Sequence, residues 1–343
     1  MNVGLIGTGA IAHKHADSYN EIGYKVVAVS NRGAAKGREF AEKYDAEFHA
    51  DYRELCRRPD LDFVDICAFP DSRLAMTKEA IANGKHVLVQ KPISLTLDEA
   101  QQMIDLARDA DLRLGVVSQH RFDDCSLFLS KAIADGRLGK IIQADGYVKW
   151  HRPQAYYDRP GKGTWAVEGG GALINQGIHT ADILLFLAGP VRELFANWQL
   201  SVAHRMESED VVNAVITYAS GATGVLQAST AIHPGYPERL EIHGTKGSAI
   251  IEGDHLTTWD VEGDDGSDAP LTTQVDSGAS DPMAISLEPI KRQFRDFGNA
   301  ITNNRKPLCA GEEGYTALQL VLSVYQSARD GRKIELEPAF LTT

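Results

Sequence analysis

A lysine follows one of the predicted strands at a position where it could assist catalysis. The strand His86–Val89 leads into Gln90, Lys91 and Pro92. Proline restricts the residue before it to extended geometry, so Lys91 is held at the carboxyl end of a predicted parallel strand, where ligands bind in open α/β sheets. A lysine there could lower the pKa of a substrate hydroxyl and stabilise the alkoxide that develops as its proton leaves and hydride departs from the carbon. In isolation, the tripeptide is more simply a surface lysine at a strand end.

A glycine run precedes a helix that carries a histidine. Glu168 is followed by three glycines and then by Asn175, His179 and Asp182. The glycines let the backbone approach another group closely, and the four-residue interval places Asn175 and His179 on one helix face. Neutral histidine can accept the proton of an alcohol, and Asp182 could orient its ring. We predict no metal site, because asparagine is a weak zinc ligand and no third His or Cys is adjacent.

The first strand runs into the glycine-rich loop Gly7-Thr8-Gly9-Ala10-Ile11-Ala12, which has the pattern G-x-G-x-x-A. The first glycine permits a tight turn, the second lets the backbone approach a pyrophosphate, and the small third residue allows close helix–strand packing. The following helix points its free N–H groups at the phosphates. We predict that Gly7, Thr8, Gly9, Ala10 and Ile11 bind a dinucleotide; a tight turn without a ligand is the alternative.

The second strand ends in Ser30, Asn31 and Arg32. An NAD site usually has Asp or Glu here for the ribose hydroxyls. Without that carboxylate a 2′-phosphate is not repelled, and Arg32 could pair with it, so NADP is favoured. NAD stays open, because Asn31 can bond a 2′-hydroxyl and Arg32 can be solvated.

The order of the predicted elements indicates two domains. Up to about residue 120, strands alternate with helices, which predicts a doubly wound α/β domain with a parallel sheet over residues 1–121. The predicted strands are Val3–Ile6, Lys25–Ser30, Phe63–Cys67, His86–Val89 and Arg113–Val117, and the helices include Lys36–Tyr44, Leu74–Asn83 and Leu97–Ala110.

The rest of the chain, residues 122–343, is predicted to be an α+β domain around a mostly antiparallel sheet, because its strands follow one another with short turns. The predicted strands are Ile141–Trp150, Leu194–Val202, Val211–Ala219, Ala222–Ser229, Arg239–His243 and Ser248–Glu252, and the helices are Ser126–Ala134, Ala172–Leu187, Ile290–Asn303 and Gly314–Arg329.

Composition excludes several classes of protein. With 343 residues, 35 basic and 47 acidic side chains and a net charge of −12, the chain offers no positive field for nucleic acid or anionic membranes. Its four scattered cysteines, and a longest apolar run of only Ile183–Ala188, predict a soluble cytoplasmic protein. Nine acidic residues and no lysine or arginine lie between Glu252 and Asp281, which predicts a solvated segment; a calcium loop is the weaker alternative.

Three motifs in this order resemble the glucose–fructose oxidoreductase, inositol dehydrogenase and rhizopine catabolism (Gfo/Idh/MocA) family. They are the glycine-rich loop, the segment Gly84–Pro92 and the segment Gly169–Asp182, and the likeness continues through Gly244–Gly247 to Tyr325–Ala328. The resemblance implies a Rossmann domain, a large open-faced antiparallel sheet used for homodimer or homotetramer contacts, and reversible NAD(P)-dependent oxidation of a secondary alcohol on a sugar, cyclitol or polyol. By position, Lys91 and His179 match the family's catalytic lysine and histidine.

Three positions depart from the family pattern. Gln90 replaces a glutamate of the cofactor site, although an amide can still hydrogen-bond. Asn175 stands where many members have aspartate, so His179 would act without a carboxylate one turn before it; we interpret this as a subgroup trait and keep Asn175 as catalytic. Ala68-Phe69-Pro70 replaces T-P-N in the cofactor loop, with Arg73 where histidine is common.

The second domain and the loop before the glycine run are expected to supply substrate contacts, because aromatic faces pack on sugars while Arg and His reach hydroxyls. The candidates are Arg121, Tyr157 and Trp165, together with Asn175 and His179, and less strongly His151, Arg152 and Tyr156; His13 and His120 are assigned structural roles. We expect a sugar or polyol dehydrogenase. A catalytically silent dinucleotide-binding scaffold, and an internal oxidation–elimination on a glycoside, remain alternatives.

Overall fold

The computed structural model describes residues 1–272, 286–337 and 340, and its chain divides into two compact units. Unit 1 contains Met1–Gln119 and Ser286–Tyr315, and unit 2 contains His120–Ile285 and Thr316–Thr343. Our division at residue 121 placed the segment 286–315 in the second domain, whereas the structure groups it with unit 1. The reason is aromatic packing within unit 1: Phe294 in α10 (Leu287–Thr302) stacks on Tyr19 in α1 (Ala10–Glu21), with ring centroids 4.2 Å apart.

Unit 1 is built on a six-stranded parallel sheet, sheet A, in the order β3-β2-β1-β4-β5-β6. The strands are β1 Asn2–Ile6, β2 Lys25–Ser30, β3 Glu47–His49, β4 Phe63–Ile66, β5 His86–Val89 and β6 Leu114–Val116. Besides α1 and α10, the unit contains α2 Ala34–Lys43, α3 Tyr52–Cys56, η1 Pro70–Ser72, α4 Arg73–Ala82, α5 Leu97–Asp109 and the start of η2 Gln119–Phe122. This confirms the predicted Rossmann fold.

Short elements of unit 1 are absent from our predictions: strand β3, helix α3 and the turns η1 and η2. Strand β3 has three residues at the edge of sheet A, none of them fully buried, so it leaves no apolar run. Helix α3 has five residues and is started by Asp51, whose side chain accepts a hydrogen bond from the backbone N–H of Arg53. Elements this short lack the periodic pattern on which sequence-based prediction depends.

Unit 2 is built on an eight-stranded sheet, sheet B, in the order β13-β12-β11-β7-β10-β9-β8-β14. Only β7 and β10 pair in parallel; the other neighbours are antiparallel, as predicted for most of the sheet. The strands are β7 Ile141–Lys149, β8 Val191–Gln199, β9 Val211–Tyr218, β10 Thr223–Ser229, β11 Arg239–Gly244, β12 Gly247–Glu252, β13 His255–Val261 and β14 Ile334–Glu335.

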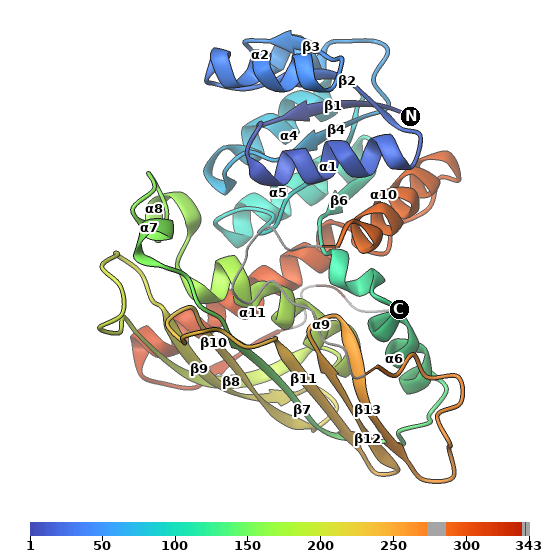
Figure 1. Ribbon diagram of the computed structural model, residues 1–343, viewed down its shortest axis with the longest axis vertical. Helices are drawn as coiled ribbons and strands as arrows, with labels where there is room; N and C mark the ends of the chain where they lie inside the picture. Colours follow the sequence, from blue (N-terminus) through green and yellow to red (C-terminus); the bar gives the residue numbers. More distant parts are fainter. Residues whose placement is uncertain (273–285, 338–339, 341–343) are drawn as a thin grey trace. The chain divides into compact units, whose positions relative to one another are not determined.

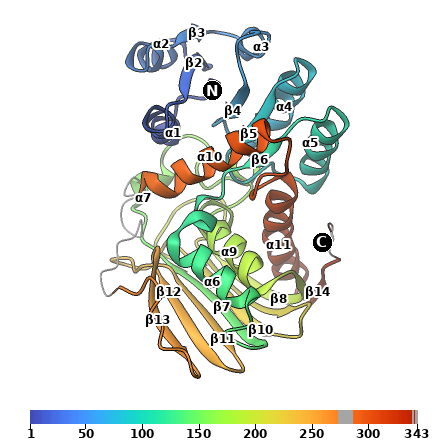
Figure 2. The same cartoon turned by 90° about the vertical axis from the view of Figure 1, so that its right-hand side faces the viewer.

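The helices of unit 2 lie on one side of sheet B (Figures 1 and 2). They are α6 Asp124–Ala134, α7 Gln154–Tyr157, α8 Trp165–Glu168, the π-helical turn η3 Leu173–Gly177, α9 Ile178–Ala188 and most of α11 Gly311–Asp330. Figures 1 and 2 show the sheet as one curved layer with α6, α9 and α11 on the same side, and no helix of the described residues covers the opposite face. On that face Phe195 in β8 is 49% exposed and lies opposite Val215 in β9, which is 60% exposed.

The acidic segment that begins at Glu252 is not simply a solvated excursion. Its residues 255–261 form β13, where Trp259 is buried with its ring 5.0 Å from that of Phe128. Asp264 and Asp268 both pair with Arg137, at 2.7 and 2.8 Å, so these carboxylates neutralise an arginine instead of resembling a calcium loop. The last part of the segment, residues 273–281, lies outside the described residues.

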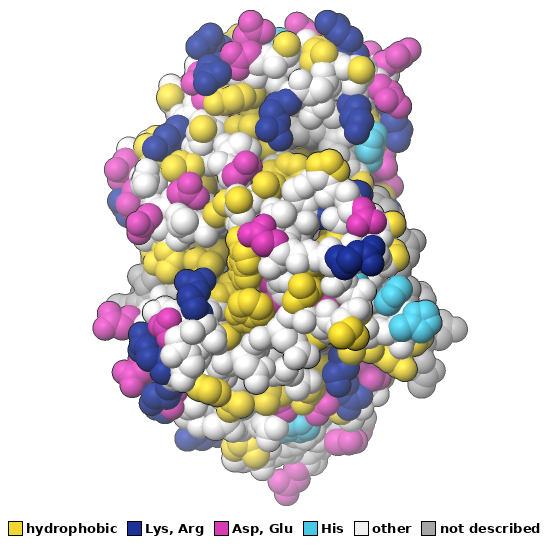
Figure 3. Space-filling view, turned by 90° about the vertical axis from the view of Figure 1, so that its left-hand side faces the viewer, with side chains coloured by type: hydrophobic (Ala, Val, Ile, Leu, Met, Phe, Trp, Pro, Cys, Tyr) yellow, Lys and Arg dark blue, Asp and Glu magenta, His cyan; other side chains and the backbone are white. Residues whose placement is uncertain are grey.

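One helical stretch, Trp165–Ala188, is long and apolar enough to cross a membrane, with a mean hydropathy of 1.2. However, 78% of that window is buried inside the protein, as expected for a core helix. On the face shown in Figure 3, basic and acidic side chains are interspersed.

Candidate active site

The glycine-rich loop of unit 1 has the geometry of a phosphate-binding turn. Gly7 has a φ of +97°, and a Cβ there would lie 2.9 Å from the backbone nitrogen of Ala68, so only glycine fits the turn. Gly9 caps α1 without a side-chain hydrogen bond, and an added Cβ would meet no atom within 4 Å. The first residues of α1, Ala10 and Ile11, therefore present N–H groups to open space.

Thr8 supplies an independent sign that this loop accepts a ligand. Its Oγ1 atom is buried but has no hydrogen-bond partner among the described residues. Buried hydroxyls are almost always paired, because leaving one unpaired costs about 1–3 kcal/mol. The loop thus offers a free hydroxyl, open space at Gly9 and the positive end of a helix dipole, which together suit the pyrophosphate of a dinucleotide.

The end of β2 leaves one cation free. Asn31 donates its side-chain amide to the carbonyl of Gly33, at 3.0 Å, at the start of α2. Arg32 is exposed, with no ion pair or hydrogen bond among the residues that the structure describes. Arg32 is therefore available for an anionic ligand, whereas Asn31 is already engaged.

The predicted cofactor residues Pro70 and Gln90 are both buried. Pro70 begins η1, and Gln90 is 6% exposed. Both polar atoms of the Gln90 amide have partners inside unit 1: Nε2 lies 2.9 Å from Nε2 of His15, and Oε1 accepts the backbone N–H of Lys91 at 3.0 Å. Gln90 therefore bonds to the backbone of the loop that carries Lys91.

The glycine run of unit 2 lies against other residues of the same unit. A Cβ on Gly170 would lie 2.4 Å from the Tyr325 hydroxyl, and one on Gly171 would lie 1.9 Å from the carbonyl oxygen of Glu209. The buried Glu209 carboxylate accepts hydrogen bonds from the backbone of Gly171 and Leu173 and from Tyr325. Burial raises the pKa of Glu209, and its hydrogen bonds partly offset this. Glu209 and Tyr325 were not among the predicted site residues, because they lie far away in the chain.

The predicted helix Ala172–Leu187 is not α-helical throughout, because its first turn is η3, a π-helical turn. The four-residue spacing of Asn175 and His179 thus spans a change of helix type. Asn175 donates to the buried Glu168, at 3.1 Å, and Glu168 also binds Lys162. Because π-helical turns are rare and often mark functional sites, η3 places Asn175 in a distinctive setting.

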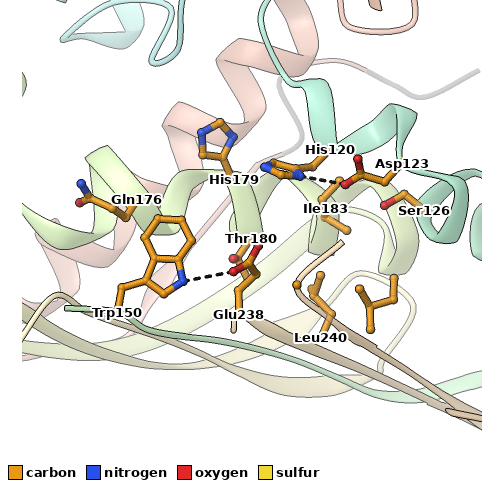
Figure 4. Close-up of a pocket in the computed structure, with 12 residues that line it drawn as sticks. His120, Asp123, Ser126, Trp150, Gln176, His179, Thr180, Ile183, Glu238 and Leu240 are labelled. Atoms are coloured by element: carbon orange, nitrogen blue, oxygen red, sulfur yellow. Dashed lines mark hydrogen bonds and ion pairs between the residues drawn. The ribbon is translucent and has the colours of Figure 1, made fainter. Parts of the chain in front are cut away.

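His179 lies at the rim of a pocket within unit 2. Figure 4 shows His179 beside His120 on the helical side of this pocket, and Trp150 with Glu238 toward the sheet. The rings of His179 and His120 are edge to face, with centroids 5.2 Å apart. Burial alone would lower the pKa of His120, but the Asp123 carboxylate at 2.8 Å outweighs it and raises the pKa to about 9. His120, which we had assigned a structural role, therefore brings a positive charge close to His179.

Glu238 and Trp150 also escaped the sequence analysis. The Trp150 indole N–H donates to Glu238 at 3.1 Å, and burial raises the pKa of that carboxyl. Trp150 directly follows β7 and Glu238 directly precedes β11, two strands that pair with each other. A sequence signal existed in retrospect: a tryptophan ends a predicted strand immediately before His151 and Arg152.

Asp182 and Arg121 pair with each other inside unit 2. Asp182 binds Arg121 through both oxygens, at 2.9 and 2.6 Å, and both side chains are buried. A carboxylate held in this way neutralises the arginine, because a buried charge needs a partner. The structure thus places Asp182 and Arg121 in a buried ion pair with each other.

The predicted aromatic substrate contacts differ in accessibility. Tyr157 is buried inside unit 2, with its hydroxyl 2.6 Å from that of Thr230. Trp165 is half-buried against Tyr325 and Trp198. Arg152 is 2% exposed beneath the Trp150 ring, and the half-buried His151 lies against His233. Tyr156 accepts a hydrogen bond from Gln176, a pocket residue.

Comparison with protein families assigns the fold. The model of the Gfo/Idh/MocA oxidoreductases with an NAD-binding Rossmann fold matches residues 1–118, and that of the family's C-terminal domain matches residues 127–250. The chain belongs to the Gfo/Idh/MocA family. It is therefore an NAD(P)-dependent oxidoreductase of the dehydrogenase type, as the motifs predicted.

Members of the Gfo/Idh/MocA family with assigned names are similar over almost the whole chain. The myo-inositol 2-dehydrogenase of Thermotoga maritima is 27% identical, over 98% of this chain and 99% of that protein. The D-glucoside 3-dehydrogenase of Escherichia coli is 26% identical, over 98% and 97%. The WlbA dehydrogenase of Bordetella pertussis, solved with NADH and UDP-GlcNAcA, has a TM-score of 0.89 and 25% identity, over 98% of each chain.

Proposed function

We propose that this protein reversibly oxidises a secondary hydroxyl of a sugar, cyclitol or related polyol, with NAD or NADP as hydride acceptor. The observation that carries the proposal is the unpaired Thr8 hydroxyl beside the open Gly9 position, in a chain whose relatives are named for the oxidation of inositol and glucosides. A silent scaffold has no evident need for a ligand-ready loop of this kind.

Lys91 and His179 carry the chemistry in this proposal. Lys91 places its cation beside the substrate hydroxyl and favours the alkoxide, and His179 accepts the hydroxyl proton. When bound, the dinucleotide supplies the hydride acceptor. Asn175 orients the substrate or His179 from the π-helical turn, held in turn by Glu168. His120 borders the same pocket, with its ring edge to face with that of His179.

The cofactor residues proposed are Gly7, Thr8, Gly9, Ala10, Ile11, Asn31, Arg32, Pro70, Gln90 and Lys91. Among these, Arg32 decides the preference: its free guanidinium supports NADP over NAD. Michaelis constants for both cofactors, measured in the parent and in Arg32→Ala, test this. We expect NADP to be favoured and the preference to fall at least about tenfold in the variant, about 1.4 kcal/mol. A parent that prefers NAD would contradict the NADP assignment while leaving the dehydrogenase assignment intact.

The activity is tested by mixing the protein with NAD or NADP and a panel of cyclitols, sugars and sugar acids, and following the near-ultraviolet absorbance of the reduced cofactor. We expect at least one polyol to reduce the cofactor. Thermal shift with the same panel separates the alternatives, because a bound ligand raises the unfolding temperature. A sugar that stabilises the cofactor-loaded protein, with no member of the panel giving any absorbance change, would favour the silent scaffold.

We further propose a cytoplasmic homodimer or homotetramer formed through the uncovered face of sheet B, where Phe195 and Val215 are exposed side by side. All four cysteines are free thiols, which supports a reducing compartment. No nucleic-acid or membrane partner is proposed. Sedimentation of the parent and of Phe195→Lys tests the assembly: we expect the variant to dissociate, and an unchanged mass would contradict this interface.

A further inference from the structure

The loop that carries Lys91 is held by a buried arginine. Arg73, the first residue of α4, is 4% exposed. Its Nη1 donates to the carbonyl of Gln90, at 2.5 Å, and to that of Pro92, the two residues that flank Lys91. Its Nε donates to the carbonyl of Ala68, at 2.9 Å. One guanidinium therefore ties together the loops that follow β4 and β5, neighbouring strands of sheet A. We call Arg73 and these three carbonyls the Arg73 clamp.

The charge of Arg73 is held without an ion pair. No carboxylate of the described residues lies within ion-pairing distance, and all of its hydrogen bonds go to backbone carbonyls. Burial lowers the pKa of Arg73 to about 9, which reflects the cost of keeping the charge there. A buried charge without a counter-ion is expensive, so the position calls for a role that a neutral side chain cannot fill. The planar fork of arginine can reach several carbonyls at once, which no aliphatic side chain can do.

Gln90 completes the support from the other side of the backbone. Tyr19 donates to Asp65, at 2.8 Å, and Nδ1 of His15 lies 2.7 Å from the same carboxylate. His15 thus donates to Asp65 through Nδ1, which leaves Nε2 to accept the N–H of the Gln90 amide. The amide orientation is fixed by this chain, so Oε1 faces the backbone N–H of Lys91. The backbone on both sides of Lys91 is therefore bonded to buried side chains.

We propose that Arg73 is a positioning residue for Lys91: through the carbonyls of Gln90 and Pro92 it fixes the backbone from which the catalytic lysine reaches the substrate hydroxyl. The inference rests on the proposed function of Lys91. Arg73 touches neither substrate nor reacting atoms in this scheme. A displacement of about 1 Å at a catalytic group can cost on the order of 10²-fold in rate, so the clamp affects turnover much more than binding.

The test compares Arg73→Met and Arg73→Lys with a matched control, Lys85→Met. Lys85 is also a buried cation that donates to a backbone carbonyl, that of Leu61 at 3.1 Å, but it lies at the opposite end of β5. We expect Arg73→Met to lower kcat on the order of 10²-fold per folded molecule, with KM for the cofactor changed less than about threefold. Arg73→Lys, which keeps the charge, should recover part of kcat. Lys85→Met should lose stability but keep the parental kcat.

A second measurement needs no turnover. Lysines are reductively methylated with isotope-labelled methyl groups, and the Lys91 signal, assigned by its loss in Lys91→Arg, is followed by NMR. We expect this signal to shift or broaden in Arg73→Met and to stay unchanged in Lys85→Met. If no panel alcohol reduces the cofactor in the parent, the proposed function fails, but the NMR result still decides whether Arg73 orders Lys91. An unchanged Lys91 signal, or an equal loss of kcat in Arg73→Met and Lys85→Met, would overturn the inference.

Discussion

Two glycine-rich turns precede helices in this protein, and the space left by their glycines is used in opposite ways. In unit 1, an added Cβ at Gly9 would meet nothing within 4 Å, and the adjacent Thr8 hydroxyl has no partner among the described residues. In unit 2, the space that side chains at Gly170 and Gly171 would need is occupied by Tyr325 and Glu209. A glycine run therefore predicts a close approach without telling whether a ligand or the chain itself makes it.

The most direct test of this difference is to add one methyl group to each turn. We expect Gly171→Ala to destabilise unit 2 by at least about 3 kcal/mol, because its Cβ would lie 1.9 Å from a rigid backbone oxygen. The unfolding free energy from urea titration measures this. A variant as stable as the parent would show that the turn can relax and that its glycines are not required by packing.

Gly9→Ala is the matched change in the open turn. Gly9 has a φ of −76°, which alanine adopts freely, so stability should change by less than about 0.5 kcal/mol. Affinity for NAD, measured by calorimetry, should fall at least about tenfold, because the methyl group occupies the space that a pyrophosphate needs. Unchanged affinity would contradict the assignment of this loop to the cofactor.

Tyr325→Phe probes the filled turn more gently. The phenol donates to Glu209 at 2.9 Å and accepts the backbone N–H of Ile174 at 3.2 Å, so its loss should cost about 1–3 kcal/mol. Tyr157→Phe, which removes a hydroxyl bonded to Thr230 in the same unit, is the control and should cost about 1 kcal/mol.

The Tyr325→Phe deficit should also depend on pH. Burial raises the pKa of Glu209 in the folded state, so the stability that its protonated form contributes is lost as the pH rises through that pKa. The Tyr325 hydrogen bond opposes the increase in the Glu209 pKa. The free energy of unfolding that Tyr325→Phe loses relative to the parent should therefore be larger at neutral pH than at acidic pH. A deficit independent of pH would argue against a role for Tyr325 in holding the Glu209 charge.

Thr8→Val has the smallest expected effect. Removing a buried hydroxyl that has no partner should leave stability unchanged or raise it by up to about 1 kcal/mol, while NAD affinity should fall about 3- to 10-fold through one lost hydrogen bond. Lower stability with unchanged NAD affinity would instead show that the Thr8 hydroxyl stabilises the fold and does not bind the cofactor.

The fold was largely predictable, because the periodic patterns that specify it are local. The alternation of strands and helices gave sheet A, and most boundaries agree within two residues, as for β2 and β5. What escaped prediction was short, like β3, or set in a polar segment, like β13. The return of α10 to unit 1 depends on Phe294 meeting Tyr19, a contact between distant residues.

The candidate site was predictable only at the positions that motifs mark. Lys91, His179 and the glycine loop follow from spacing, whereas their supports are contributed by residues far away in the chain: Arg73 and His15 for Lys91, and Glu209 and Tyr325 for the turn before His179. Arg121 and Tyr157 have the residue types that bind sugars, but buried partners already engage them. Residue type predicts what a side chain can bind, and only the fold decides what it does bind.

The central claim, that Lys91 and His179 oxidise a polyol with a bound dinucleotide, is tested most directly by the rate of cofactor reduction. The rate is measured for the parent, Lys91→Ala and His179→Ala with the best polyol of the panel, and thermal unfolding verifies that the variants are folded. We predict that kcat/KM falls at least about 10²-fold in each variant while the cofactor still binds. Folded variants that reduce the cofactor as fast as the parent would contradict the account.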